Sequence, residues 1–168
     1  SDGTLIEKKM EEYRHIAYTI STDENVINAL LDDVLEDSES SQIYNSIYLM
    51  LNSDNKNCDA HIVSLSGKCR LSSGIFPSEY DTRFQTNEWN RKNIIAEAST
   101  RRDLGRTSLF FIGDHRVNEN DEQILFSILR NIFSENDELI GYVIVDVYTD
   151  AVIPELTNGS IFKDVILV

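Results

Sequence analysis

Two long apolar segments joined by a short acidic link constrain the fold of this chain more than any other feature of its sequence. The segments are QILFSILRNIF, residues 123–133, and LIGYVIVDVY, residues 139–148, and the link between them is SENDE. The first segment has a periodicity that a helix could share, but the short link and the strand-like second segment favour two strands. We therefore expect an antiparallel hairpin of two buried strands.

Each of these strands carries one charged residue inside its apolar run, Arg130 in the first and Asp146 in the second. A turn centred on Asn136 would place Arg130 opposite Tyr142 and Asp146 opposite Phe126. In that register the two charged residues share one face of the sheet, four residues apart, which is too far for a simple ion pair. Both could line one cavity. Alternatively, Asp146 faces solvent or caps a neighbouring loop.

The N-terminal third of the chain has a helical hydrophobic period. A first stripe recurs at spacings of four and three residues and consists of Ile6, Met10, Tyr13, Ala17 and Ile20. This stripe predicts a helix of at least about four turns. Ser21, Thr22 and Asp23 end it and can cap a second helix, which carries Val26, Ile27, Leu30, Leu31, Val34 and Leu35. A third helix is expected after the polar link EDSESS, with Ile43, Tyr44, Ile47, Tyr48 and Leu51.

After the helices the period changes to that of strands. AHIVSLSGKCRLSS predicts a β-hairpin with its turn at Ser66 and Gly67. NRKNIIAEAS predicts a short helix, TSLFFIGDHR a strand, and DAVIPEL a short helix or turn. With the two long segments, this order indicates an α+β domain built on an antiparallel sheet.

Composition limits the classes of partner. The formal net charge is −14 at pH 7, and a surface this acidic repels nucleic acid and anionic membrane faces. A length of 168 residues suits one domain, or one domain with a fragment of another. No segment approaches the roughly 18 apolar residues of a membrane span, and no signal peptide opens the chain.

The sequence lacks the common catalytic and cofactor motifs, including GxxxxGKS/T, GxGxxG, HExxH and GxSxG. Its three histidines, His15, His61 and His115, are scattered, and we interpret each as an ordinary surface or half-buried residue. Cys58 and Cys69 flank the expected hairpin, offset too far for a disulfide. We expect no catalytic residue, metal site or cofactor.

Taken together, these pieces resemble the membrane-distal part of a double Cache sensor domain, the extracellular type found in Gram-positive sensor histidine kinases and bacterial chemoreceptors. The resemblance covers roughly residues 4–157 and rests mainly on HIVSLSGK and IGYVIVDVY, with IFPSEY and EWNRKNIIAEA between them. It implies a PAS-like fold, in which a long N-terminal helix and further helices pack on a central antiparallel sheet.

The resemblance also implies an organisation within a longer receptor. Residues 1–52 would be a helical segment leading from a transmembrane helix, 53–157 the distal Cache domain, and 158–168 the start of a truncated membrane-proximal lobe. The domain would be extracellular, on a parent anchored in the cell membrane that dimerises through the N-terminal helix. The parent would be a histidine protein kinase of a two-component system, whereas this fragment would not be an enzyme.

A ligand site is implied as well. In Cache domains that bind amino acids, an aspartate on this strand takes the amino group, while an arginine and aromatic residues from the loop after the hairpin hold the carboxylate. Asp146 is at the matching strand position, and the loop offers Tyr80, Arg83 and Trp89. Arg83 and Trp89 are six residues apart, whereas the family keeps its pair almost adjacent. Further residues that could line the same cavity are Arg130, Tyr142 and Tyr148. The expected ligand is a small molecule such as an amino acid, an amine or a carboxylate.

Three alternatives stay open at this point. The chain could be the ectodomain of a chemoreceptor or of another Cache receptor. It could be a protein-interaction module that binds no small molecule. It could also be a soluble intracellular α+β enzyme, although the missing motifs speak against that.

Overall fold

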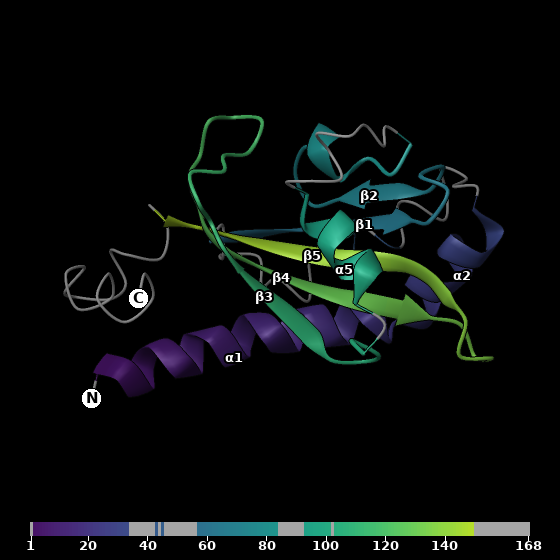
Figure 1. Cartoon of the computed structure of the whole chain (residues 1–168), viewed down its shortest axis with the longest axis horizontal. Helices are drawn as coiled ribbons and strands as arrows, with labels where there is room; N and C mark the ends of the chain where they lie inside the picture. The colour runs from purple at the N-terminus through teal and green to yellow at the C-terminus, as the bar shows by residue number, and fades with distance from the viewer. Residues whose placement is uncertain are drawn as a thin grey trace.

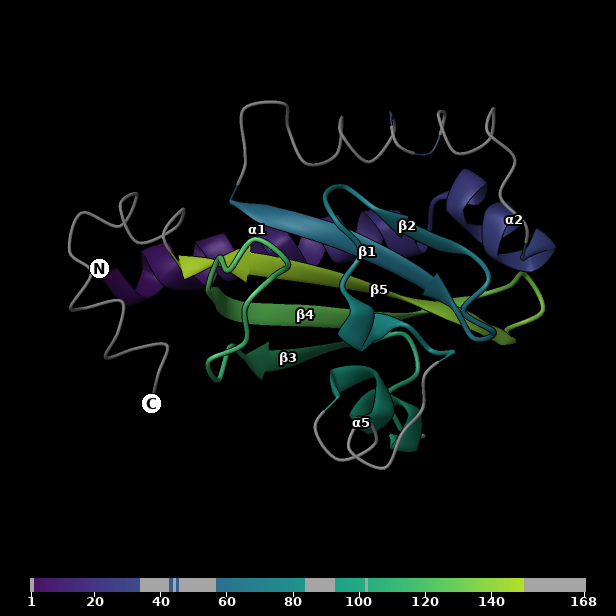
Figure 2. The same ribbon diagram turned by 90° about the horizontal axis from the view of Figure 1, so that it is seen from above.

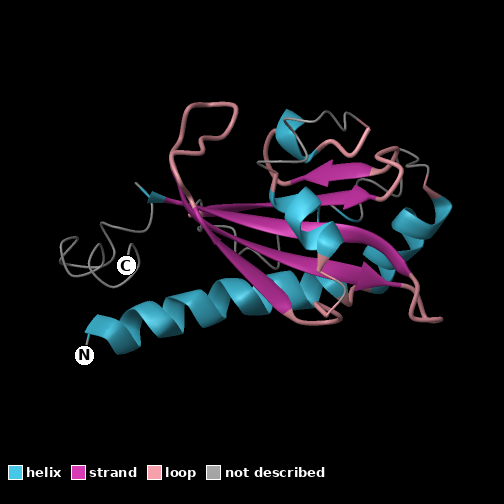
Figure 3. Ribbon diagram, in the orientation of Figure 1, coloured by secondary structure: helices cyan, strands magenta, loops and turns pink. Residues whose placement is uncertain are grey.

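The computed structural model describes residues 2–33, 43, 45, 57–83, 93–101 and 103–149. Its helices are α1 (Asp2–Ser21), α2 (Glu24–Asp32) and α5 (Ile94–Thr100), with a 3-10 turn, η1 (Ser78–Tyr80). Its strands are β1 (Cys58–Ser64), β2 (Arg70–Ser72), β3 (Ser108–Ile112), β4 (Ile124–Phe133) and β5 (Leu139–Tyr148). Figure 3 shows the two kinds of element together. The predicted α+β class is confirmed.

The described strands form one antiparallel sheet in the order β2-β1-β5-β4-β3. Helix α1 runs along one face of this sheet, and α5 and η1 lie on the other (Figures 1 and 2). The predicted hairpins β1–β2 and β4–β5 are both present. Strand β5 lies at the centre, between β1 and β4, and its residues from Gly141 to Tyr148 are buried.

Helix α1 packs on the sheet through the stripe that the sequence predicts. Tyr13, Ala17 and Ile20 are fully buried, and Met10 is partly buried against the same cluster. The Tyr13 ring meets the edge of Phe126 on β4 with ring centroids 5.9 Å apart. Full burial of each large apolar side chain stabilises the domain by about 1.5–3 kcal/mol, so this stripe fixes α1 on the sheet.

Helix α2 begins and ends as its sequence predicts. The Asp23 carboxylate accepts a hydrogen bond from the Val26 amide at 3.0 Å, as an N-cap should. At the other end, Asp33 adopts the left-handed conformation that ends a helix. The Leu30 side chain then reaches Gly141 on the central strand. A Cβ added at Gly141 would lie 3.2 Å from the Leu30 methyl groups and 2.5 Å from the Val63 carbonyl oxygen.

Some predicted elements lie wholly or mostly outside the described residues. Of the third helix, only Ile43 and Asn45 are described, and both are helical. DAVIPEL, FKDVILV and the predicted domain boundaries at 52 and 157 lie outside the described residues. Cys58 and Cys69 are described and are buried free thiols.

The β4–β5 hairpin forms, but its predicted register is wrong by one residue. Phe133 pairs with Leu139, and an irregularity between Ile132 and Phe133 then shifts the pairing. A bulge of this kind adds one residue to one strand and so changes which side chains share a face. As a result Arg130 pairs with Val143 and Asp146 pairs with Ser127, instead of with Tyr142 and Phe126.

The shift separates the two charged residues that were expected to share a face. Arg130 lies on the α1 face, where its guanidinium sits over the Tyr18 ring at 5.0 Å from the centroid. Asp146 lies on the opposite face, with Ser127. Arg130 and Asp146 therefore cannot line one cavity.

Candidate functional site

Asp146 lies near the end of the central strand and is completely buried. Its neighbours Val145 and Val147 belong to the core beneath α1, so the carboxylate points to the face that carries η1 and α5. It pairs across β4 with Ser127 and across β1 with Asp59. The expectation that Asp146 faces solvent is therefore excluded.

One oxygen of this carboxylate is well satisfied. Asp146 Oδ1 accepts a hydrogen bond from the Tyr80 hydroxyl at 2.8 Å and another from the Ser127 hydroxyl at 2.5 Å. Tyr80 belongs to η1 and Ser127 to β4, so the carboxylate joins the central sheet to the segment above it. Hydrogen bonds to a charged acceptor are stronger than those between neutral groups, which makes this junction important for the fold.

The second oxygen of the Asp146 carboxylate, Oδ2, is not satisfied in this way. Asp146 Oδ2 is buried and accepts no hydrogen bond from the part of the chain that the structure describes. His61 Nε2 lies 3.4 Å from this oxygen, but the two atoms form no hydrogen bond, since neither has a hydrogen-bond partner among the described residues. The contact is electrostatic, and Oδ2 keeps its capacity to accept.

His61 is almost completely buried on β1, which corrects the expectation that it is a surface or half-buried residue. Its Nδ1 lies 2.8 Å from the Ser72 hydroxyl oxygen, which also accepts from the Gly74 amide at 3.0 Å. A carboxylate only accepts, so the facing Asp146 favours a proton on Nε2. At Nδ1 the ring and the Ser72 hydroxyl share a hydrogen bond whose donor depends on the protonation of the ring.

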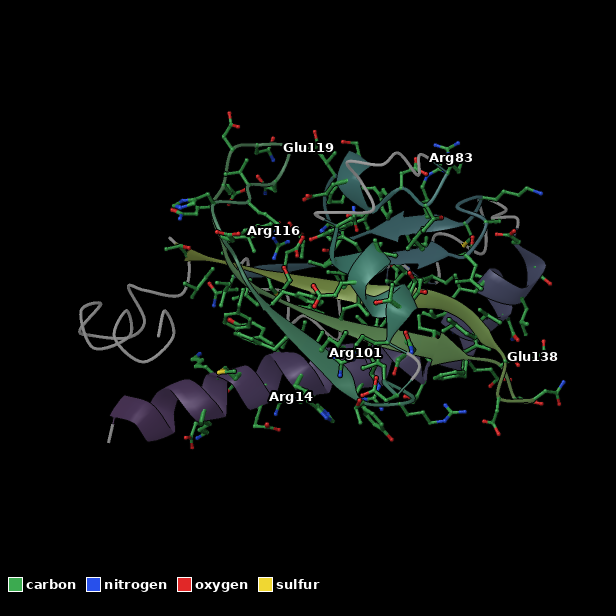
Figure 4. The ribbon with its side chains drawn as sticks, in the orientation of Figure 1. Arg14, Arg83, Arg101, Arg116, Glu119 and Glu138 are labelled. Carbon is green, nitrogen blue, oxygen red and sulfur yellow. The ribbon has the colours of Figure 1, made fainter. Side chains whose placement is uncertain are left out.

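Arg116, in the connection between β3 and β4, forms a second layer over Asp146. Its guanidinium donates to the Tyr80 hydroxyl at 2.9 Å and to the Ser127 hydroxyl at 2.8 Å. These are the same two hydroxyls that donate to Asp146 Oδ1, so the Tyr80 and Ser127 hydroxyls bridge the Arg116 guanidinium and the Asp146 carboxylate. Figure 4 shows Arg116 where this connection leaves β3, below Glu119.

The electrostatic environment keeps Asp146 ionised. Burial acts to raise the pKa of Asp146, but His61, the hydrogen bond from Ser127 and the charge of Arg116 together outweigh burial and lower that pKa below its ordinary value. Burial raises the pKa of Tyr80 well above its ordinary range, and the neighbouring Asp146 charge adds to this effect. The phenol therefore stays neutral and remains a donor.

Further carboxylates surround the site. Asp59, directly across the sheet from Asp146, accepts hydrogen bonds from the Tyr148 hydroxyl at 2.5 Å and from the Ser73 hydroxyl at 2.7 Å. Glu79 lies beside Tyr80, and its pKa is raised by burial and by the charges of Asp146 and Glu119, against the opposing charge of Arg116. The side chains around Asp146 are thus predominantly acidic.

The structure brings together only part of the set that the sequence proposed. Tyr80 bonds to Asp146, Tyr148 bonds to the neighbouring Asp59, and Tyr142 lies buried on the same face in the apolar cluster that contains Tyr80. Arg130 is on the other face. Trp89 lies outside the described residues.

Arg83, the arginine expected to hold a ligand carboxylate, is at the β1–β2 turn. An added Cβ at Gly67 in that turn would meet the Arg83 side chain at 2.5 Å. Its guanidinium forms an ion pair with Asp81 at 2.7 Å, and Figure 4 shows it well separated from Arg116 along the strands.

Three residues of the site were missed by sequence reasoning: His61, Arg116 and Ser127. The alternation of β1 could have indicated His61, because it shares its face with Asp59 and Val63. Ser127 was hidden by the bulge in the hairpin. Arg116 lies in an irregular connection, where no period relates it to the sheet.

Comparison of the sequence with protein-family models and with curated proteins found no match to either. Among the described residues, no three histidine, cysteine or acidic side chains are grouped so as to hold a metal ion. Nor does the described part of the chain contain a helix with the length and apolar character that crossing a membrane requires.

Proposed function

We propose that the chain is the ligand-sensing input domain of a bacterial transmembrane receptor of the double Cache type, and that it binds a small amine-bearing ligand at Asp146. The observation that carries this proposal is a fully buried, ionised carboxylate with one oxygen that accepts no hydrogen bond among the described residues. A buried charge is costly unless it is paired. A bound cation would balance this charge, either by donating to Oδ2 or through the Tyr80 and Ser127 hydroxyls that donate to Oδ1.

The arrangement of the elements supports the same proposal. A long N-terminal helix lies across one face of an antiparallel sheet, and Asp146 points to the other face from the central strand. The resemblance to double Cache domains implies a PAS-like fold of this kind with an aspartate at this strand position. A ligand bound on one face could act on α1 through the shared strands.

The acidic surroundings favour a cationic ligand over an anionic one. Asp59 and Glu79 lie near Asp146, and Glu119 lies near Glu79, whereas the basic groups there are Arg116 and His61, and Arg83 is paired with Asp81. A free carboxylate on the ligand would meet these like charges. An amine is therefore the proposed class, in preference to an amino acid or a carboxylate.

The proposal includes the wider receptor that the resemblance implies. The domain would be extracellular, on a membrane-anchored parent that is a two-component sensor histidine kinase. The parent would form a homodimer through α1. Because the Met10 to Ile20 stripe is used by the domain itself, the dimer contact would lie on the outward side of α1, where Glu7 and Glu11 are exposed.

A thermal-shift screen of the wild-type protein against primary amines, amino acids, carboxylates and sugars tests the proposal, since a ligand that binds only the folded state raises Tm. We expect amines to raise Tm in the wild type and to lose that effect in Asp146→Asn. Asparagine keeps an acceptor for Tyr80 and Ser127, whereas Asp146→Ala would leave both donors without an acceptor and disturb the fold.

Asp137→Asn, an exposed change on the same sheet hairpin, is the control and should respond as the wild type does. Amine shifts that survive unchanged in Asp146→Asn would refute the assignment.

The second candidate is a protein-interaction module without a small-molecule ligand. It is favoured by the hydrogen bonds that Tyr80, Ser127 and Arg116 already make around Asp146, because such a network can be purely structural. An absence of any shift across the whole panel would support this candidate.

A further inference from the structure

We propose that Arg116 acts as an internal substitute for the ligand: its guanidinium occupies the place that a small guanidinium or ammonium compound takes when it binds. This inference rests on the proposed function, because it assumes that the Asp146 site receives a ligand. It adds the class of ligand, an organic cation without a carboxylate, and the group that the ligand displaces.

Arg116 is a cation without an ion pair to the described residues. Arg14, Arg83, Arg101 and Arg106 each form an ion pair with an acidic residue close by. Among the described arginines, Arg70, Arg116 and Arg130 form none, and of these three only Arg116 bonds to the hydroxyls that donate to Asp146. Its guanidinium donates instead to two hydroxyls and to the Ile112 carbonyl oxygen at 3.3 Å. It is therefore a cation held on neutral acceptors, one layer away from the carboxylate whose charge it balances.

The hydroxyls of Tyr80 and Ser127 limit which chemical groups can replace the Arg116 guanidinium. Tyr80 and Ser127 each use their single proton on Asp146, so toward Arg116 they can only accept. A replacement must therefore donate hydrogen bonds to both oxygens. It must also be positively charged, because it would otherwise leave the buried Asp146 charge uncompensated. A guanidinium or an ammonium group meets both conditions, whereas an amide or a urea meets only the first.

The position of Arg116 places it on the route from solvent. Its residue is half-buried, whereas Tyr80 and Ser127 beneath it are almost fully buried. A cation that approaches this face of the sheet meets the Arg116 layer before it meets Asp146. Exchange of one cation for another then keeps the charge of the site constant, which avoids the cost of an uncompensated carboxylate.

Displacement would also change the connection that carries Arg116. This connection, residues 113–123, contacts η1 at two points: Arg116 bonds to Tyr80, and Glu119 accepts from the Ser78 amide at 3.3 Å. Its base is fixed, because Gly113 lies so close to β4 that an added Cβ would overlap the Ile124 carbonyl oxygen. Release of Arg116 would therefore loosen the outer part of the connection from η1, while its base stays in place.

Chemical rescue tests this inference. Arg116→Ala removes the internal cation, and methylguanidine supplies a free one of the same chemistry, with methylurea as its neutral counterpart. We expect methylguanidine to bind Arg116→Ala on the order of tenfold more tightly than the wild type, measured as the concentration dependence of Tm, because the internal competitor is gone. Methylurea should give no gain. Arg101→Ala, which removes an exposed arginine paired with Asp103, is the matched control and should behave as the wild type does.

The outcomes separate this inference from the proposed function. If an amine binds the wild type through Asp146 but methylguanidine binds Arg116→Ala no more tightly, the proposed function stands and the inference is overturned. If methylguanidine is favoured by Arg116→Ala but no cation binds the wild type at any concentration tested, methylguanidine only refills the space that the arginine leaves, and the inference and the proposed function both fail. Should Arg116→Ala not fold, Arg116→Gln keeps the first part of the side chain, ends near the position of Nε and removes the charge, so the place of the outer guanidinium is free and the same comparison applies to it. Equal responses to methylguanidine and methylurea would overturn the inference in either variant.

Discussion

Replacement of the buried carboxylate by its neutral counterpart, Asp146→Asn, should lower the free energy of unfolding by a calculable amount. Tyr80 and Ser127 both donate to Asp146 Oδ1. A hydrogen bond to a charged acceptor contributes about 1.5–3 kcal/mol, and one to a neutral acceptor contributes about 1 kcal/mol. The change weakens two such bonds, so the expected loss is roughly 1–4 kcal/mol at pH 7.

The loss should depend on pH with a definite sign. The pKa of Asp146 is lowered in the folded protein, whereas in the unfolded chain it returns to about 3.9. A group whose folded pKa is depressed contributes stability above its unfolded pKa, and that contribution is lost as the pH falls through the folded value. The difference between wild type and Asp146→Asn should therefore be constant from about pH 5 to pH 7 and should narrow below about pH 4.

Urea unfolding of both proteins between pH 3 and pH 7, followed by circular dichroism, measures this difference. Asp137→Asn is the control, because Asp137 is exposed and asparagine also tolerates its positive φ of 59°; its effect should stay within about 1 kcal/mol. An Asp146→Asn protein as stable as the wild type, or more stable, would show that desolvation of the charge outweighs its hydrogen bonds and would refute the reasoning. A difference that widens toward acid pH would refute it equally.

Three further changes test other parts of the structure. Gly141→Ala should destabilise the domain by about 1–3 kcal/mol, because its new Cβ would lie 2.5 Å from the Val63 carbonyl oxygen; an unchanged urea midpoint would contradict the close approach of β1 and β5. Asp23→Ala should cost about 1 kcal/mol through loss of the α2 N-cap, and Asp23→Asn, which keeps the acceptor, should restore most of it in the same assay. Burial, together with the charges of Asp59 and Asp146, raises the pKa of the Cys58 thiol to about 12. This thiol should therefore resist a disulfide exchange reagent at pH 8 in the native state and react after unfolding. Rapid labelling of Cys58 in the native protein, mapped by mass spectrometry, would argue against its burial.

Much of the fold was predictable because it depends on hydrophobic period. The stripe from Met10 to Ile20 packs on the sheet as its spacing indicates, and the hairpins around Gly67 and Asn136 form where their turns were expected. These features are local: a period of 3.6 or 2 and a turn residue specify each of them. The α+β class follows from their order along the chain.

The candidate site was only partly predictable, because a single bulge decides it. Period alone cannot predict that Ile140 of β5 is the extra residue, opposite the step from Ile132 to Phe133. That extra residue moves Arg130 to the α1 face and brings Ser127 beside Asp146. The place of Arg116 depends on the path of an irregular connection. Asp146 itself could be identified, since a carboxylate within an apolar strand demands partners wherever it points.

The placement of Arg116 changes how the resemblance to Cache domains is to be read. The resemblance led us to expect an arginine near Trp89 that holds a ligand carboxylate, but Arg83 is paired with Asp81 at the β1–β2 turn. The arginine that lies over Asp146 is Arg116, which follows β3 at the opposite edge of the sheet from β2. It neutralises the aspartate, and so points to competition with a cationic ligand.

The most direct test of the central proposal is an NMR titration of the ¹⁵N-labelled protein with the amine that raises Tm most. We predict that the largest chemical-shift changes fall on Asp146, Ser127 and Tyr80 and on the Arg116 side-chain Nε–H, and that Asp146→Asn abolishes them. Changes confined to residues away from this face, or the same changes in Asp146→Asn, would contradict the claim that Asp146 anchors a ligand.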